Sequence, residues 1–167
     1  MHKAKACIIT CIDFRFHNKI RKFLKLNGYT GKMDLISVAG ASHDLVHPLS
    51  QAESIYLWNQ IAISIKLHSP DEIVIIDHQD CGMYKASGLI KDGMNLEEDK
   101  KVHQDLLINL NKELRKRFPQ SNVKLNLWYA KLDGSIDPLF GPSGEKDDEN
   151  IGLNLGLISE DNAATRP

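Results

Sequence analysis

The sequence predicts an α/β fold: a mainly parallel sheet of about four strands flanked by helices, with room for a short antiparallel strand at one edge. The first observation is the order of the segments, because short apolar runs alternate with amphipathic helical patterns as β-α-β-α-β-α-β. The second is that several runs are almost entirely apolar, as expected for strands covered on both faces. The third is size, since 167 residues with 42% hydrophobic content suffice for one domain with its own core.

The chain opens with a strand over residues 6–11, an almost continuous apolar run. Ile20 and Leu24 then recur at helical spacing, and Gly28 suits the end of that helix because glycine readily adopts a left-handed backbone conformation. A second strand is expected over residues 35–40.

A long helix is expected next, because Ser50 and Glu53 have the spacing of a capping box. Pro70 marks its end, since proline disfavours helix at the residue before it. The third strand, residues 72–78, is rich in the β-branched residues that strands favour. One stripe of the long helix is expected to face the core, namely Ile55, Trp58, Ala62 and Ile65.

Apolar residues recur at every fourth position from 102 to 118, which predicts one helix that Pro119 ends. Residues 123–129 then alternate apolar side chains with polar ones or with tryptophan, so this strand is expected near an edge of the sheet. Asp133 and Gly134 form a predicted turn after it.

The chain is expected to form one domain followed by a tail. Residues 1–140 contain every predicted strand and helix, and no internal repeat or second domain is evident. Residues 141–167 are rich in Gly, Asp, Asn, Glu and Ser, which predicts a loose polar C-terminal tail.

Composition excludes several classes of protein. The 21 Lys and Arg residues are balanced by 22 Asp and Glu residues, and a net charge of −1 argues against a strongly basic nucleic-acid-binding protein. The chain has no run of eighteen apolar residues, so we expect no membrane-spanning helix, and no cleavage site follows the first apolar run. Three cysteines are too few for a disulfide framework, so reduced thiols and a cytoplasmic location are expected.

Two short motifs follow predicted strands. Cys-Ile-Asp-Phe-Arg begins at Cys11, at the end of the first strand, and His-Gln-Asp-Cys-Gly begins at His78, at the end of the third. Open α/β sheets bind their ligands in the crevice outside the carboxyl ends of the strands. If these two strands are neighbours, Cys11, His78 and Cys81 meet in one crevice.

Two thiolates and one imidazole are a ligand set that zinc favours. Three protein ligands leave a fourth position open, which is the mark of a catalytic zinc site. Cys7 lies four residues back along the first strand, too far to share the metal, and is expected to be a small core residue.

The combination of Cys-x-Asp-x-Arg with His-x-x-Cys-Gly resembles the β-class carbonic anhydrases. Three stretches of this sequence agree with that family: Val-Ala-Gly-Ala at 38–41, the segment at 75–83, and the segment from Trp-Tyr to Gly at 128–134. The resemblance covers roughly residues 4–140.

The resemblance implies a zinc-binding domain with one zinc ion per chain, held by Cys11, His78 and Cys81. The implied activity is the reversible hydration of carbon dioxide to bicarbonate by a zinc-bound hydroxide. Asp13 and Arg15 are the implied catalytic pair: Asp13 accepts a hydrogen bond from the hydroxide, and Arg15 keeps Asp13 ionised and oriented. In some members the aspartate instead takes the fourth zinc position in a closed, inactive state.

The resemblance also implies a homodimer with active sites near the subunit interface, and the edge-like strand at 123–129 favours the same assembly. The expected partner is otherwise a small-molecule substrate, carbon dioxide or bicarbonate, with no nucleic acid and no membrane. Two alternatives stay open. One is hydrolysis of a related heterocumulene such as carbonyl sulfide or carbon disulfide, and the other is a non-catalytic homologue that binds zinc or an anion.

Ser37 and Val38 stand where the family usually has Arg and Asn. Ser37 carries no charge and Val38 donates no side-chain hydrogen bond, so the crevice should be less cationic and bicarbonate more weakly held. We therefore expect measurable but low hydration activity, which increases above neutral pH.

Further polar residues lie close to the two motifs. Asp77 and Asp80 flank predicted ligands, where either could accept the second ring N–H of His78 or cap a loop. His43 and His47 lie in a loop that could overhang the crevice.

Overall fold

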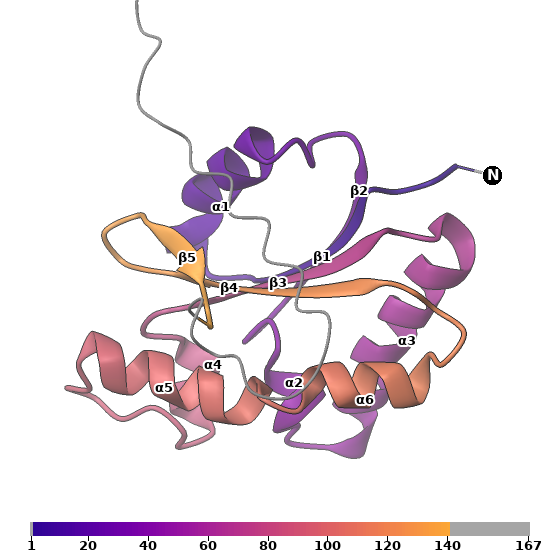
Figure 1. Cartoon of the computed structure of the whole chain (residues 1–167). Helices are drawn as coiled ribbons and strands as arrows, with labels where there is room; N and C mark the ends of the chain where they lie inside the picture. Colours follow the sequence, from indigo (N-terminus) through magenta and orange to yellow (C-terminus); the bar gives the residue numbers. More distant parts are fainter. Residues whose placement is uncertain (1, 141–167) are drawn as a thin grey trace, which may run out of the picture.

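The protein is described by a computed structural model over residues 2–140, which form a five-stranded sheet with helices on both faces (Figure 1). The order across the sheet is β2-β1-β3-β4-β5, in which the first four strands are parallel and the last pairs antiparallel with its neighbour. The predicted fold class is therefore confirmed, and the predicted tail at 141–167 lies outside the described residues. The strands are β1 (Ala6–Cys11), β2 (Met33–Val38), β3 (Glu72–His78), β4 (Lys124–Ala130) and β5 (Ile136–Pro138).

Within residues 2–140, one helix covers the first face of the sheet and the other five helices cover the second face (Figure 1). On the first face, α1 (Phe14–Leu26) buries Phe16, Ile20 and Leu24 against β1 and β3. None of the helices within residues 2–140 has both the length and the apolar character that crossing a bilayer requires. The second face is covered by α2 (His43–Val46), α3 (Gln51–His68), α4 (Gly82–Ala86), α5 (Leu96–Leu107) and α6 (Leu110–Arg117).

The connections place a crevice at the ends of β1 and β3. From β1 the chain crosses to β2 through α1 on one face, and from β2 it returns past β1 to β3 through α3 on the other. The two connections diverge at the carboxyl ends of β1 and β3, which is where open α/β sheets leave room for a ligand. Both strands are buried almost throughout, as their apolar sequences require.

Local signals at the helix ends are confirmed. Ser50 accepts from the Glu53 N–H at 3.3 Å and Glu53 accepts from the Ser50 N–H at 2.8 Å, which completes the predicted capping box of α3. Ser69 ends that helix in a left-handed conformation, with φ of 43°, directly before Pro70. Gly28 has φ of 68° just beyond α1, as expected for a glycine at a helix end.

The predicted core stripe of α3 is confirmed at Trp58 and Ile65, which pack in or against the core, and is wrong at Ile55. The structure buries Leu57, Trp58, Ile61 and Ser64, while Ile55 is 51% exposed. Apolar side chains occur on almost every side of this helix, so its periodicity does not specify which side faces the sheet.

The single helix predicted over residues 102–118 is instead two helices, α5 and α6, separated at Ile108 and Asn109. A side chain every four residues advances about 40° per step around an α-helix, which has 3.6 residues per turn. One straight helix would therefore rotate its apolar side away from the sheet. The break at 108–109 returns Leu110 and Leu114 to the core.

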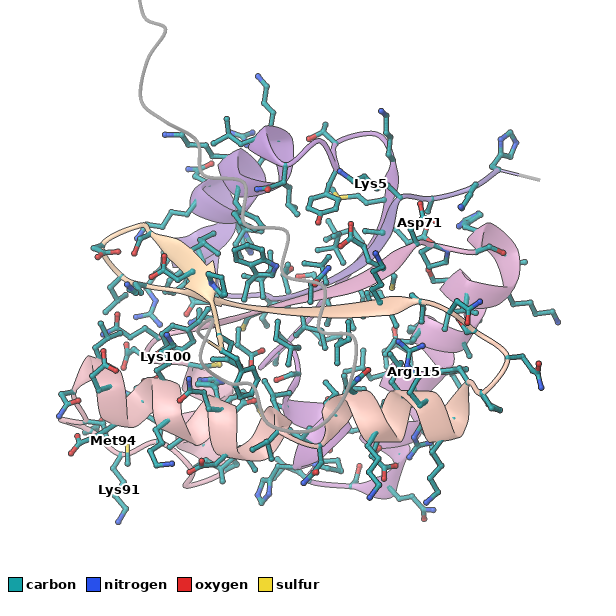
Figure 2. The ribbon with its side chains drawn as sticks, viewed as in Figure 1. Lys5, Asp71, Lys91, Met94, Lys100 and Arg115 are labelled. Carbon is teal, nitrogen blue, oxygen red and sulfur yellow. The ribbon has the colours of Figure 1, made fainter. Side chains whose placement is uncertain are left out.

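Arg115 hydrogen bonds to the connection between α6 and β4 (Figure 2). Its guanidinium donates to the carbonyl oxygen of Ser121 at 3.0 Å and to that of Val123 at 2.5 Å. These contacts fix the entry to β4, the strand whose predicted position near the edge is confirmed by the three-residue β5 beyond it.

Candidate metal centre

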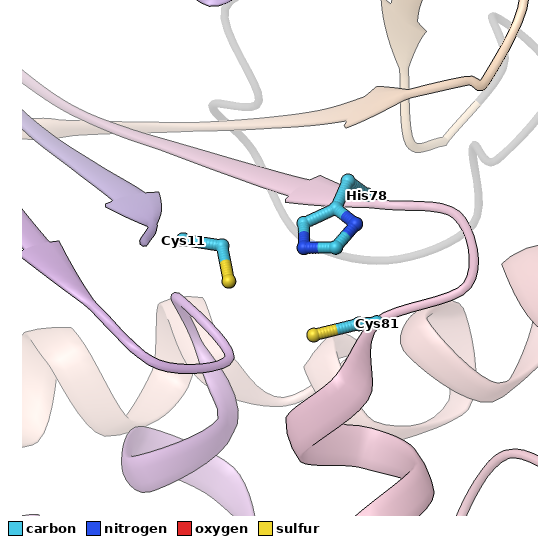
Figure 3. Close-up of side chains that lie close together, drawn as sticks. All are labelled: Cys11, His78 and Cys81. Carbon is cyan, nitrogen blue, oxygen red and sulfur yellow. The ribbon is translucent and has the colours of Figure 1, made fainter. Parts of the chain in front are cut away.

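The structure brings Cys11, His78 and Cys81 together at the carboxyl ends of the two central strands (Figure 3). Cys11 is the last residue of β1, His78 is the last residue of β3, and Cys81 precedes α4. One sulfur or nitrogen atom from each lies within 4.8 Å of the other two. All three side chains are buried. They are far apart in sequence and lie close together because β1 and β3 are neighbouring parallel strands.

The ring of His78 is oriented by its own loop. Its Nδ1 lies 2.9 Å from the carbonyl oxygen of Gln79, which only accepts, so Nδ1 carries the proton and Nε2 carries a lone pair. Phe16 packs on the ring with 4.3 Å between centroids. Nε2 is buried with no hydrogen-bond partner among residues 2–140, as are the Nε2 atoms of His43 and His103, but only that of His78 lies beside two cysteine sulfurs.

The two thiols share a proton unequally. The neighbouring Cys81 side chain has the largest of the effects that lower the pKa of Cys11 to about 4. The same contact raises the pKa of Cys81, because a neighbouring thiolate disfavours a second one. The Gly40 N–H also points at the Cys11 sulfur from 3.3 Å. The site therefore already favours one thiolate, and a bound cation would favour the second.

Asp13 and Arg15 lie beside this cluster as a bidentate pair. The Arg15 guanidinium donates to both carboxylate oxygens of Asp13, at 3.0 and 2.6 Å, and this contact is the main reason that the pKa of Asp13 falls to about 2. Asp13 also caps α1 by accepting from the Arg15 N–H. Its Oδ2 lies 4.0 Å from Nε2 of His78, so an ionised carboxylate faces the cluster.

Arg15 reaches across to the turn between His78 and Cys81. It donates to the Asp80 carboxylate at 2.7 Å and to the Asp80 carbonyl oxygen at 2.9 Å. Of the two roles predicted for Asp77 and Asp80, acceptance of the second ring N–H of His78 is wrong, because the carbonyl oxygen of Gln79 accepts it. The other role, capping a loop, is confirmed for Asp77, which accepts from the Ser42 N–H in the loop after β2. Asp80 instead holds Arg15, and Asp77 turns to the opposite face of the sheet.

A cavity of about 350 Å³ lies beside the cluster, and Cys11 is the member of the cluster that lines it. Of the residues that line it, Asp13 and Arg15 are the oppositely charged ones, and they neutralise each other. Much of the remaining wall is apolar, with Ile12, Phe14 and Met83 contributing side chains. The cavity therefore suits a small neutral molecule better than a highly charged one.

The loop after β2 closes one side of this cavity and depends on a glycine. Gly40 has φ of 77°, and a Cβ there would lie 2.7 Å from Cβ of His43 and 2.9 Å from Cγ of Met83. Only glycine allows this close approach without displacement. His43 is fully buried against Tyr84, so it packs behind the loop and does not overhang the cavity.

Ser37 and Val38 lie on the edge strand β2, directly beside the end of β1. Ser37 is exposed, and its hydroxyl lies 3.5 Å from the carbonyl oxygen of Cys11. Val38 is half-buried and packs against the core, and its carbonyl oxygen accepts from the Ile12 N–H. Cys7 is buried in the core, where burial raises the pKa of its thiol to about 11, which fits the predicted structural role.

Sequence interpretation missed a second buried polar group behind the metal centre. His103 and Asp99 lie four residues apart on the buried side of α5 and meet Asp77 from β3. The available signal was two polar residues spaced by one helical turn within an apolar repeat. It was overlooked because the repeat itself indicated only an amphipathic helix.

Known proteins share both the sequence pattern and the fold. The sequence model of a family described as "Putative carbonic anhydrase" matches residues 1–115. An uncharacterized protein of Rickettsia bellii is 28% identical over 140 residues, which cover 84% of each chain. An uncharacterized protein of Rickettsia conorii is 26% identical over 141 residues, covering 84% of this chain and 74% of its own.

Solved structures agree. A tetrameric β-carbonic anhydrase of Sordaria macrospora matches with a TM-score of 0.56 at 15% identity, over 84% of this chain and 83% of that one. A Coccomyxa β-carbonic anhydrase in complex with acetazolamide matches with a TM-score of 0.58 at 11% identity, over 84% and 73% of the two chains. At such identities the likeness shows the fold, and the family match covers most of the sequence. The chain therefore belongs to the family described as putative carbonic anhydrases and has the β-carbonic anhydrase fold.

Proposed function

We propose that this protein is a zinc-dependent carbonic anhydrase, with Cys11, His78 and Cys81 as the protein ligands of one zinc ion per chain. The observation that carries the proposal is the unpartnered, buried Nε2 of His78 facing two cysteine sulfurs. Two sulfurs and one imidazole nitrogen are a zinc ligand set, and three protein ligands leave one position for water or substrate. Zinc held by these residues would lower the pKa of a bound water to about 7 and so would supply a nucleophile near neutral pH.

Asp13 and Arg15 contribute orientation and charge. The Asp13 carboxylate stays ionised at all ordinary pH values and can only accept hydrogen bonds. An acceptor at this place orients an attacking O–H group so that its lone pair points into the cavity. Arg15 fixes both oxygens of Asp13 and ties them to the Asp80 turn, so the acceptor is positioned before substrate arrives.

The cavity favours carbon dioxide over an anion on entry. Apolar side chains from Ile12 and Phe14 line its wall, and Ser37 brings no charge to the neighbouring strand. Weak binding of bicarbonate promotes its release after hydration, although it also slows the reverse reaction at low bicarbonate. The same neutral wall suits carbonyl sulfide or carbon disulfide, and this is the basis of the second candidate, heterocumulene hydrolysis.

We further propose a cytoplasmic homodimer. The β-carbonic anhydrases of Sordaria macrospora are described as tetrameric, and this supports self-association of the present chain. Strand β2 has no partner on its outer side among the described residues, and Leu35 on it is 56% exposed. A second copy would cover this edge. Three buried, unpaired cysteines fit a reducing compartment.

Stopped-flow measurement of carbon dioxide hydration by zinc-loaded protein tests the activity. We expect hydration above the buffer rate that increases with pH, and slower or no turnover of carbonyl sulfide. Zinc-loaded protein that hydrolyses carbonyl sulfide but leaves carbon dioxide hydration at the buffer rate would assign the second candidate. Loaded protein that turns over neither substrate would reject both enzymatic functions.

A further inference from the structure

Behind the candidate metal centre, the protein buries charged side chains that have no direct part in the proposed reaction. Asp77, Asp99 and His103 are each at most 3% exposed. Burying three titratable groups is costly unless they satisfy one another, so their arrangement calls for a physical reason. We call these residues and the side chains that hydrogen bond to them the His103 cluster: Asp77, Asp99 and His103 with Ser42, Tyr84 and Tyr129.

Asp77 joins the loop after β2 to the helices that follow the ligands. It precedes His78 in β3, so its side chain points to the opposite face of the sheet. There its carboxylate accepts from the Ser42 N–H at 3.2 Å, the Ser42 hydroxyl at 2.6 Å and the Tyr84 hydroxyl at 3.3 Å. The loop held through Ser42 contains Gly40, whose N–H points at the Cys11 sulfur.

Asp99 supports the turn that carries Cys81. Its Oδ2 accepts from the Asp80 N–H at 2.9 Å, and its Oδ1 accepts from the Tyr129 hydroxyl. Asp80 has φ of 60°, a left-handed conformation that residues with side chains rarely adopt. The turn is held in this conformation from two sides, because Arg15 binds the Asp80 carbonyl oxygen and carboxylate from the cavity side.

His103 lies between the two carboxylates. Its Nδ1 is 2.8 Å from Oδ2 of Asp77, and its Nε2 is 3.6 Å from Oδ1 of Asp99. Burial lowers the pKa of His103, but the hydrogen bond to Asp77 and the negative charges of Asp77 and Asp99 outweigh burial and raise it to about 9. The ring is therefore a cation at neutral pH, and it offsets the repulsion between two buried carboxylates.

We propose that His103 is a positioning residue for the metal centre, which it orders by holding Asp77 and Asp99 in place. Asp77 fixes the loop that contacts Cys11, and Asp99 fixes the turn that carries Cys81 and contacts Arg15. The inference rests on the proposed function, because the geometry that His103 protects is that of the zinc ligands and the Asp13–Arg15 pair. Residues that do not bind the metal but orient its ligands commonly change metal affinity or activity by about tenfold or more when they are replaced.

A matched pair of variants separates the two contacts of the ring. His103→Asn places an amide nitrogen where Nδ1 faces Asp77, while His103→Gln extends its amide toward Asp99. Both remove the positive charge. His68→Gln is the control, because it breaks another His–Asp contact, the 2.8 Å pair with Asp34 near the opposite end of the strands.

The test uses the full chain loaded with Co²⁺, since the visible absorption of cobalt bound to thiolates reports ligand geometry without requiring turnover. We expect both His103 variants to bind about one Co²⁺ per chain with shifted absorption bands. We also expect kcat for carbon dioxide hydration to fall about tenfold, with KM changed less than about twofold. His68→Gln should match wild type in both readouts. Folded His103 variants with wild-type bands and wild-type kcat would overturn the proposal.

Combination with Arg15→Ala tests the route by which His103 acts. If it acts through the Asp80 turn, the effects of His103→Gln and Arg15→Ala on kcat are not additive. Should the His103 variants fail to fold, Asp99→Asn carries the same spectroscopic test, because it leaves the ring with Asp77 and alters the support of Asp80. Unchanged bands in folded Asp99→Asn would likewise contradict the proposal.

Failure of the proposed function has a different signature. Wild-type protein that binds no Co²⁺ would refute the proposed metal centre itself. Wild-type protein that binds Co²⁺ but hydrates no carbon dioxide would refute the activity, while the absorption bands of the His103 variants would still decide whether His103 positions the ligands.

Discussion

At the scale of single residues, Arg15 links the two halves of the candidate site. It grips Asp13 at the end of β1 and Asp80 in the turn after β3, with every contact between 2.6 and 3.0 Å. The guanidinium of Arg15 therefore hydrogen bonds to residues of both sequence motifs. A planar fork with several donors is needed for this, which lysine does not offer.

Replacing Arg15 by alanine should leave zinc bound but impair turnover. The three proposed ligands stay intact, whereas Asp13 loses the contact that chiefly lowers its pKa and fixes its oxygens. We expect one zinc per chain and a fall in kcat of roughly tenfold or more. Metal analysis and stopped-flow kinetics check this, with Arg117→Ala as control because Arg117 packs on Trp58, away from the cavity. A wild-type rate at several pH values would reject the role of Arg15.

The three residues of the candidate metal site and the Asp13–Arg15 pair beside it were predictable from sequence, but the groups that hold them from behind were not. Cys11, His78 and Cys81 follow from strand ends and motif spacing, because the topology of a parallel sheet brings such ends together. The acceptor of the His78 ring N–H is a backbone carbonyl, which no residue type indicates. His103 is brought to Asp77 by the packing of α5, and a single sequence contains no measure of that distance.

At the scale of elements, the loop between β2 and α2 fixes the wall of the cavity. Gly40 combines a positive φ with close contacts to His43 and Met83. Gly31 has a similar φ of 74°, but a Cβ added there would have no atom of the described residues within 4 Å. The two glycines therefore separate the effect of backbone strain from that of crowding.

Gly40→Ala should be more destabilising than Gly31→Ala. Each costs about 1–2 kcal/mol for a left-handed alanine, and Gly40→Ala adds about 1–3 kcal/mol for crowding. It should also weaken zinc binding, because its N–H points at Cys11. Urea unfolding and zinc titration measure both effects. Equal free energies of unfolding for the two variants would show that the close contacts at Gly40 are relieved without cost.

The α5 helix contributes stability that depends on pH through His103. The groups that face its ring are Asp77 from β3, Asp99 from α5, Tyr84 from α4 and Tyr129 from β4. The pKa of His103 is raised from 6.5 to about 9 in the folded protein. A histidine whose pKa is raised by folding stabilises the fold fully at pH values below its pKa in the unfolded protein. This stabilisation is lost as the pH rises through its pKa in the folded protein.

The free energy of unfolding should therefore be higher for wild type than for His103→Gln. The difference should be largest below pH 6.5 and should shrink as the pH approaches and passes about 9. Chemical denaturation of both proteins between pH 6 and pH 10 measures this difference. A difference that is constant across the range would mean that folding leaves the pKa of His103 unchanged.

Elements whose apolar pattern fits a single structure and orientation were predicted well, and elements with an ambiguous pattern were not. Strands β1 and β3 occupy the residues expected, because continuous β-branched and apolar runs fit only a sheet covered on both faces. The buried side of helix α3 was predicted only in part, because apolar residues occur around most of this helix. The break between α5 and α6 follows from the shape of the sheet, which the residues at 108–109 do not encode in any simple pattern.

At the scale of the whole molecule, the exposed edge lies at β2. Strand β5 pairs with residues 128–130 of β4 and so covers that part of the predicted edge, whereas β2 has no partner on its outer side among the described residues. Exposed apolar side chains also gather on the outer side of α3, where Tyr56 and Leu67 are more than half exposed. Large apolar side chains exposed in this way are typical of surfaces that bind another chain.

Sedimentation velocity at micromolar concentration should show a dimer. Leu35→Lys, which places a charge on the open edge strand, should shift the protein toward monomer. Leu132→Lys is the matched control, because Leu132 is 45% exposed in the turn before β5 at the opposite edge. A wild-type protein that sediments only as monomer would contradict the proposed assembly.

The measurement that tests the central claim most directly is the zinc content of three purified proteins: wild type, Cys81→Ala and Cys7→Ala. Cys81 is a proposed ligand, whereas Cys7 is an equally buried cysteine four residues before Cys11 on β1. The proposed centre predicts about one zinc per chain in wild type and in Cys7→Ala, and strongly reduced zinc in Cys81→Ala. Full zinc occupancy in folded Cys81→Ala, or wild-type protein that takes up no zinc, would contradict it.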